Sequence, residues 1–243
     1  MRRLIFLLIS SLYSYSWLAA QAPAAKRPVE MWAFRSVLDG TPRMLTLALH
    51  QDLYVAYDTY NCGLAKVWKE GVLKVGAVYN QKHGPQPVTV GGKYLDYPVS
   101  ESAFWVQAET STGTGPKRAK VRFKGYRFTG GKVALRYEVQ LDSLKKAELE
   151  EWPEYVDGVS GPKLERYFTW VQAPPKEFLV FAEIVTDGLS SPQSLSTQAP
   201  FTVLSRTERL TGQKPVWKIQ GLLRLSLDTA TQIHILFDPA TIL

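Results

Sequence analysis

The sequence predicts an all-β protein, a large antiparallel β-sandwich with at most one short helix. Runs rich in β-branched and aromatic residues recur along the chain, turns rich in Gly and Pro separate them at short intervals, and helix-like sequence is scarce. The predicted strands, apart from those of one hairpin, cover residues 44–50, 53–57, 64–69, 72–79, 164–171, 178–185, 201–207, 217–227 and 232–237.

The clearest local prediction is a hairpin over residues 120–141. Two alternating runs, VRFKGYRF and KVALRYEVQL, flank the turn sequence Thr129-Gly130-Gly131. The segment that follows, 142–151 (DSLKKAELEE), predicts a short helix. Asp142 or Ser143 would cap it, and its lysines would face its glutamates one turn away.

Length and composition predict one folded domain. The chain has 243 residues, of which 45% are hydrophobic, 12% aromatic and 21% charged, so it can bury a substantial core. Residues 21–243 are expected to form a single sandwich, because the density of strands is similar throughout. A flexible polar stretch at 109–116 is the best candidate for an internal seam.

The N-terminus has the layout of a secretory signal peptide over residues 1–20. Arg2 and Arg3 precede a short apolar run, and small residues follow it. The run is shorter than the about 20 apolar residues that span a bilayer, and no later segment is long and apolar enough, so we expect no transmembrane segment after cleavage. Cleavage after Ala20 would leave Gln21 first. The expected location is the periplasm, the cell surface or the medium.

Charge and motifs limit the chemistry. The formal net charge is +7, and its densest basic stretch, 117–124, alternates with apolar residues as a solvated strand face does. We therefore favour no nucleic-acid partner. Cys62 is the single cysteine, so no intramolecular disulfide can form, and its context indicates a buried apolar thiol. The three histidines lack metal-ligand spacing and there is no haem-attachment motif, so no metal and no cofactor are predicted.

A proline-stiffened loop, HGPQP at 83–87, is the most informative candidate for a ligand-binding site. It follows a stretch dense in aromatic and charged residues, and flat rings beside polar groups suit the recognition of sugars. The alternative is that the rings belong to the core and that the loop is only a connection. The predicted ligand-binding residues are Arg35, Arg43, Tyr57, Asp58, Trp68, His83 and Gln86.

The same region carries a family resemblance. Its carriers are FRSVLD at 34–39, PRM at 42–44, Tyr57-Asp58, Trp68-Lys69 and HGPQP, joined by FKGYRF at 123–128, RYE at 136–138 and RYFT at 166–169. These segments resemble uncharacterised β-sandwich domains that accompany c-type cytochrome modules and propeller-type sugar dehydrogenases in envelope proteins of Bacteroidetes and related bacteria. The resemblance implies a sandwich of the kind found in carbohydrate-active proteins. The chain departs from the fused architecture because it has no haem motif.

Three functions remain open from the sequence. The favoured one is an exported, non-catalytic binding or interaction module for a saccharide or an envelope protein. The second is a carbohydrate-active enzyme of mutarotase or lyase type, with His83 as acid or base, Asp58 or Glu70 as its partner, and Arg35 or Arg43 stabilising negative charge. The third is a structural subunit that docks a separate c-type cytochrome or redox complex. An enzyme needs those groups to converge in one pocket, whereas a binding module needs only an aromatic platform.

Overall fold

The computed structural model describes residues 30–109, 115–159, 161–189, 195–211 and 214–237. It confirms the predicted all-β class, because these residues form antiparallel sheets and the one helical element among them is a 3-10 turn, η2 (Gln81–His83). The predicted signal peptide at 1–20 lies outside the described residues, as do residues 110–114 of the predicted seam.

Three large sheets and one small one make up the fold. The N-terminal sheet has the strand order β1 (Trp32–Leu38), β2 (Thr41–His50), β3 (Leu53–Asp58), β4 (Gly63–Trp68) and β7 (Lys93–Asp96). The six-stranded sheet has the order β10 (Lys120–Thr129), β11 (Lys132–Gln140), β12 (Lys146–Gly158), β13 (Gly161–Gln172), β18 (Thr231–Leu236) and β15 (Leu195–Thr197). The β14 sheet has the order β16 (Phe201–Thr211), β17 (Lys214–Arg224), β14 (Phe178–Leu189), β8 (Phe104–Ala108) and β9 (Lys117–Arg118). A two-stranded sheet pairs β5 (Gly71–Leu73) with β6 (Val88–Val90).

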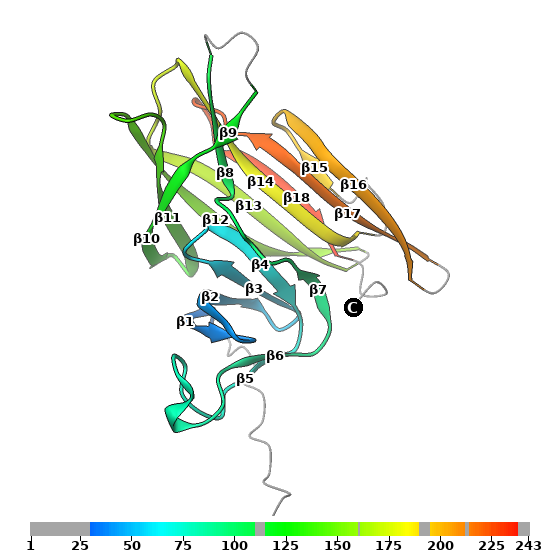
Figure 1. The fold of residues 1–243 in the computed structure, drawn as a ribbon. Helices are drawn as coiled ribbons and strands as arrows, with labels where there is room; N and C mark the ends of the chain where they lie inside the picture. Colours follow the sequence, from blue (N-terminus) through cyan, green and yellow to red (C-terminus); the bar gives the residue numbers. More distant parts are fainter. Residues whose placement is uncertain (1–29, 110–114, 160, 190–194, 212–213, 238–243) are drawn as a thin grey trace, which may run out of the picture.

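The N-terminal sheet and the β14 sheet both pack on the inner face of the six-stranded sheet (Figure 1). Aromatic rings connect the layers. The ring centres of Phe104 in β8 and Tyr137 in β11 are 5.2 Å apart, as are those of Tyr94 in β7 and Phe237, which follows β18. One buried apolar cluster therefore draws on all three sheets, and the fold is a sandwich whose second layer is built from two sheets.

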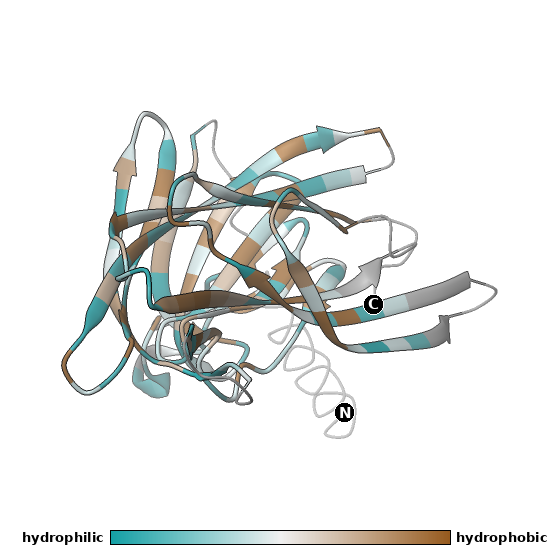
Figure 2. Cartoon of the chain, turned by 90° about the horizontal axis from the view of Figure 1, so that it is seen from above, coloured by the Kyte–Doolittle hydropathy of each residue, from teal (hydrophilic) through white to brown (hydrophobic). Residues whose placement is uncertain are grey.

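The burial pattern follows the period of two that a half-buried strand requires. In β18, Thr231, Ile233 and Ile235 are buried while the residues between them are half-exposed. Hydrophobic and hydrophilic residues alternate along many of the strands (Figure 2). The six-stranded sheet thus has one face in the core and one outer face that solvent reaches.

The N-terminal sheet is different because both of its faces are covered. β3 and β4 are buried at every position. One face contributes to the common core, and the other carries a second cluster that includes Tyr54, Trp68 and Val72. The segment after β5 helps to cover this second face, where the Nζ atom of Lys74 lies 4.0 Å from the centre of the Phe34 ring.

The predicted hairpin at 120–141 is confirmed as β10 and β11. Thr129 pairs with Lys132, so Gly130 and Gly131 form a two-residue turn. Both glycines have positive φ, 57° and 74°, which is the conformation that such a turn needs to match the twist of its strands.

The helix predicted at 142–151 is wrong. Residues 146–158 form β12, which pairs with β11 and with β13. The glutamates expected to pair with lysines along a helix instead bind arginines of other strands. Glu148 binds Arg136 of β11, and Glu150 accepts hydrogen bonds from Nε and Nη2 of Arg127 of β10 at 3.0 and 2.9 Å. Cross-strand pairing and burial of Ala147 and Leu149 outweigh the intrinsic helical preference of this sequence.

The strand predicted at 72–79 is also mostly wrong, because β5 ends at Leu73. The following residues form a loop against β1, in which the Val37 N–H donates to the Val78 carbonyl at 2.8 Å. Val75 and Tyr79 are exposed in this loop.

A buried ion pair connects the layers in the core. The Arg166 Nε donates to Glu151 Oε1 at 2.6 Å, and these side chains are only 3% and 1% exposed. The hydroxyl of Tyr57 in the N-terminal sheet donates to the same oxygen at 2.6 Å, and Tyr137 reaches the other oxygen at 3.4 Å. Burial alone lowers the pKa of Arg166, but the attraction of Glu151 outweighs burial and holds this pKa above its usual range.

We predict that Arg166→Met destabilises the protein by about 3–5 kcal/mol, because it leaves the buried Glu151 carboxylate without its cation. The double variant Glu151→Gln/Arg166→Met should lose less, since it removes both charges. Urea unfolding followed by circular dichroism measures both. The exposed pair of Lys132 and Glu154 provides the control, and Glu154→Gln should cost less than about 1 kcal/mol. Equal small losses for Arg166→Met and Glu154→Gln would contradict the role given to the buried pair.

Candidate functional site

The two aromatic residues of the predicted site lie on opposite faces of the N-terminal sheet. Tyr57 is 1% exposed and belongs to the common core, where burial and the Glu151 charge raise its pKa well above the usual value. Trp68 is fully buried in the second cluster, with its indole N–H donating to the Gly71 carbonyl at 2.7 Å. Neither ring presents a free face, so the stacking platform expected from them is not formed.

Asp58 and the two arginines lie together at one end of the N-terminal sheet. The Asp58 carboxylate accepts the N–H groups of Tyr60 and Asn61 at 2.7 and 3.2 Å, which is the bonding of a turn residue. Arg35 and Arg43 are exposed beside this turn: Arg35 donates to Thr59 Oγ1 at 3.4 Å, and the Arg43 guanidinium lies 4.5 Å from the centre of the Tyr60 ring.

The predicted loop residues, His83 and Gln86, lie between β5 and β6. His83 ends η2, and its side chain is outside the described part of the structure. Gln86 is half-exposed, and the carbonyl of the next residue, Pro87, accepts the N–H of Asp39. Glu70 contacts Lys69 at 3.8 Å in the turn after β4. None of the seven predicted residues lines the main cavities of the described structure.

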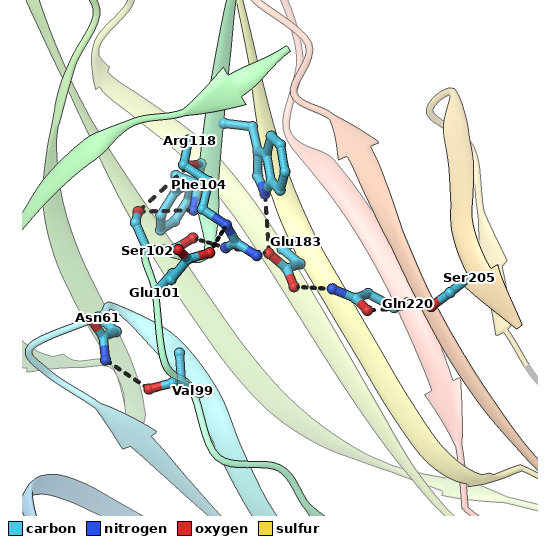
Figure 3. A network of polar contacts seen from close by, with 10 residues as sticks. Asn61, Val99, Glu101, Ser102, Phe104, Arg118, Glu183, Ser205 and Gln220 are labelled. Atoms are coloured by element: carbon cyan, nitrogen blue, oxygen red, sulfur yellow. Dashed lines mark hydrogen bonds and ion pairs between the residues drawn. The ribbon is translucent and has the colours of Figure 1, made fainter. Parts of the chain in front are cut away.

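A polar network crosses the outer face of the β14 sheet (Figure 3). Its centre is Glu183, whose carboxylate accepts Arg118 Nη1 at 2.7 Å, Trp105 Nε1 at 3.1 Å and Gln220 Nε2 at 2.7 Å. Arg118 also forms an ion pair with Glu101, in which Nε lies 2.6 Å from Oε2. The adjoining cavity of about 20 Å³ has room for one water molecule. Because both oxygens of Glu183 are bonded within the protein, this carboxylate holds the strands in place.

A cleft of about 400 Å³ opens at one end of the sandwich. The start of β14 and the connections before β16 and after β17 line it, and it has the size of a small-molecule site. Its buried polar residue, Thr231, already accepts the Ser226 N–H at 2.8 Å. Arg224 and Asp228 lie at its exposed margin. These groups do not converge on one point, so the cleft alone defines no chemistry.

The outer face of the six-stranded sheet brings aromatic and polar side chains together in register. Trp152 of β12 is directly opposite Tyr167 of β13, and Tyr167 is opposite Gln232 of β18. In the next row, Glu165 of β13 is opposite His234 of β18. All except the buried Glu165 are half-exposed. We call these five residues the outer platform.

The neighbours of Glu165 fix the polar half of the outer platform. His234 Nδ1 lies 2.7 Å from Glu165 Oε1, Gln232 Nε2 donates to Oε2 at 3.3 Å, and the Tyr167 hydroxyl also donates to Oε2. Burial raises the pKa of Glu165, but Tyr167, Lys163 and His234 together outweigh burial and hold this pKa below its usual value. The carboxylate therefore stays ionised and orients the His234 ring. Within the described residues, the other ring nitrogen of His234 has no bonding partner.

The outer platform contains none of the seven residues predicted from the sequence. Its signal was the alternation within LERYFTWV at 164–171, which separates Glu165 and Tyr167 from Leu164, Arg166 and Phe168. The equivalent signal for Trp152 was masked by the helical appearance of the preceding residues. His234 lies between the buried residues Ile233 and Ile235 and faces outward, with its ring bound to Glu165.

The thiol is buried, and the acidic groups of the described residues form no metal-ligand cluster. Cys62 is 2% exposed, and burial followed by the Asp58 charge raises its pKa to about 12. No group of His, Cys, Asp and Glu side chains among the described residues could hold a metal ion. No helix in the described ranges is long and apolar enough to cross a membrane.

Comparison of the sequence with known family models and with curated proteins gives no match. The candidate site is therefore defined by its geometry alone.

We predict that Cys62 reacts with thiol reagents only when the protein unfolds. Burial blocks access, and a pKa of about 12 keeps the group in the unreactive thiol form at pH 8. Labelling with a chromogenic disulfide across a urea gradient should follow the unfolding transition measured by circular dichroism. Stoichiometric labelling within minutes in native buffer would contradict this assignment.

Proposed function

We propose that the protein is an exported, non-catalytic binding module and that its ligand is a saccharide bound on the outer platform. The observation that carries the proposal is the register pair of Trp152 and Tyr167 on a sheet face that solvent reaches. Aromatic rings on such a face offer apolar area for the C–H faces of a sugar ring. The rings of Tyr57 and Trp68 on the N-terminal sheet are buried and offer no such area.

The polar half of the outer platform supports the same proposal. A saccharide presents hydroxyl groups around its ring, and Gln232 and His234 lie beside the aromatic pair to bond them. His234 needs no reorientation on binding, because Glu165 already holds its Nδ1 at 2.7 Å and directs the other nitrogen away from the carboxylate. Groups that are held in place before binding lose less conformational entropy when the ligand arrives.

Arg127 borders the outer platform next to Trp152. Its guanidinium lies 5.0 Å from the centre of the Trp152 ring and is fixed by two hydrogen bonds to Glu150. One part of the indole is thus covered, and the contact directs a ligand toward Tyr167 and β18. This arrangement favours a ligand that extends across the strands.

A second candidate function is favoured by the pairing of Glu165 with His234. A histidine oriented by an ionised carboxylate can take up and return a proton, which an enzyme of mutarotase or lyase type requires. In that case the same site would turn over its sugar, and His234 rather than His83 would act as acid or base. Nuclear magnetic resonance of a bound sugar separates the two functions, since only the enzyme changes the sugar's anomeric ratio or bonds.

The proposal predicts that Trp152→Ala and Tyr167→Ala each weaken saccharide binding by about 1–2 kcal/mol, the loss typical of an aromatic anchor. Isothermal calorimetry with a panel of neutral and acidic oligosaccharides first identifies a ligand, and the variants are then compared on it. Tyr79→Ala is the matched control, because Tyr79 is an exposed ring on a loop of the N-terminal half. The Tyr79→Ala variant should bind the saccharide with the affinity of the wild type.

The melting temperatures of the three variants are measured as well, because an unfolded variant would also lose binding. Binding that is unchanged in both Trp152→Ala and Tyr167→Ala, with both variants folded, would overturn the outer platform as the site. Absence of binding to every oligosaccharide in the panel would overturn the proposal that the ligand is a saccharide.

A further inference from the structure

Each of the three large sheets ends in two edge strands whose outer backbone groups lack a partner strand in the same sheet. The edges are β1 and β7, β10 and β15, and β16 and β9. An unprotected edge is a template for pairing with another chain, and proteins shield their edges by shortness, charge, bulges or cover.

Five of these edges are shielded. β7, β15 and β9 contain only four, three and two residues. The end of β1 is covered by the loop before β6, where the N–H groups of Val37 and Asp39 donate to the carbonyls of Val78 and Pro87. β10 carries four basic residues and is irregular next to Gly125, where its register with β11 shifts.

β16 is the least shielded edge of the described structure. It has 11 residues without proline or lysine, its charges are of both signs, and residues 202–208 are exposed. Its register with β17 shifts once, between Val203 and Ser205, and is regular from Ser205 to Thr211. Val203 and Leu204 are 53% and 47% exposed, so the strand also presents apolar side chains to solvent. β16 is the terminal strand of the β14 sheet, next to β17 alone (Figure 1).

The charges of β16 are arranged to complement themselves. Arg206 and Glu208 are two residues apart and therefore lie on the same face of the strand. In an antiparallel pair of two β16 strands with the two-fold axis at Thr207, Arg206 of each copy stands directly opposite Glu208 of the other. A two-fold interface requires this reciprocity, because each contact must occur twice.

The neighbouring strand leaves this pairing available. The Arg206 guanidinium lies 4.2 Å from the centre of the Trp217 ring, which holds it on one face of the sheet. Glu208 is opposite Trp217 in the register and has no ion pair with any described residue. Among the described residues this carboxylate has no cation, and a second copy would supply one.

We propose that the protein forms a two-fold homodimer by antiparallel pairing of β16 with β16 of a second copy, in which two Arg206–Glu208 pairs fix the register. The β14 sheets of the two copies become one continuous sheet. Strand addition of this kind takes its affinity from backbone hydrogen bonds and its register from side-chain pairs. This inference is independent of the saccharide proposal.

A charge-swap series tests the dimer. Sedimentation equilibrium of the purified protein should show a dimer, and Arg206→Glu or Glu208→Arg should each weaken it by about tenfold or more, because two attractive pairs become repulsive. The double variant Arg206→Glu/Glu208→Arg restores opposite charges and should return the dissociation constant to within about threefold of the wild type. Glu154→Arg, on the outer face of the six-stranded sheet, is the control and should leave association unchanged.

Hydrogen exchange provides a second readout that does not depend on any substitution. Amides of β16 should be protected at high protein concentration and lose protection on dilution. A wild-type protein that stays monomeric at about 100 µM, roughly a hundred times a micromolar dissociation constant, would overturn the proposal. A dimer that survives both single reversals would also overturn it, as would a folded double variant that remains a monomer.

Discussion

The Glu151 carboxylate meets the Arg166 guanidinium and the Tyr57 hydroxyl in a part of the core that is almost closed to water, where both charged side chains are at most 3% exposed. Two charges in such a place are stable only if each satisfies the other, because removing them from water costs several kcal/mol per ion. Glu151 and Arg166 come from adjacent strands of the six-stranded sheet, and Tyr57 comes from the N-terminal sheet. One carboxylate therefore fixes how the two layers meet.

The same pair also fixes the surface on the other side of the sheet. Side chains alternate between faces, so inward placement of Glu151 and Arg166 forces Trp152, Glu165 and Tyr167 outward. A slip of one residue would place the charges on the solvent face and the aromatic residues in the core. The register that satisfies the buried charges is thus the register that assembles the outer platform.

The sequence supports the prediction of most strands, because alternation and turn residues are local properties of the chain. It failed for 142–151, where local preference is helical and the deciding contacts, from Arg127 and Arg136, come from other strands. The burial of Tyr57 and Trp68 could not be predicted for a related reason. β3 and β4 are buried on both faces, so their apolar runs carry no alternation that would show Tyr57 and Trp68 to be interior.

The position of β18 bears on how the chain reaches this structure. β18 begins at Thr231, yet it lies within the six-stranded sheet between β13, which ends at Gln172, and β15. The sheet cannot be completed until the residues of β18 have been synthesised, and until then β13 presents the backbone edge next to Leu164 and Phe168. Chains dominated by such distant pairings fold slowly, in about milliseconds to seconds, and their open intermediates tend to aggregate. A nascent chain of this protein therefore stays incompletely folded until β18 has been synthesised, the condition in which holding chaperones engage a polypeptide.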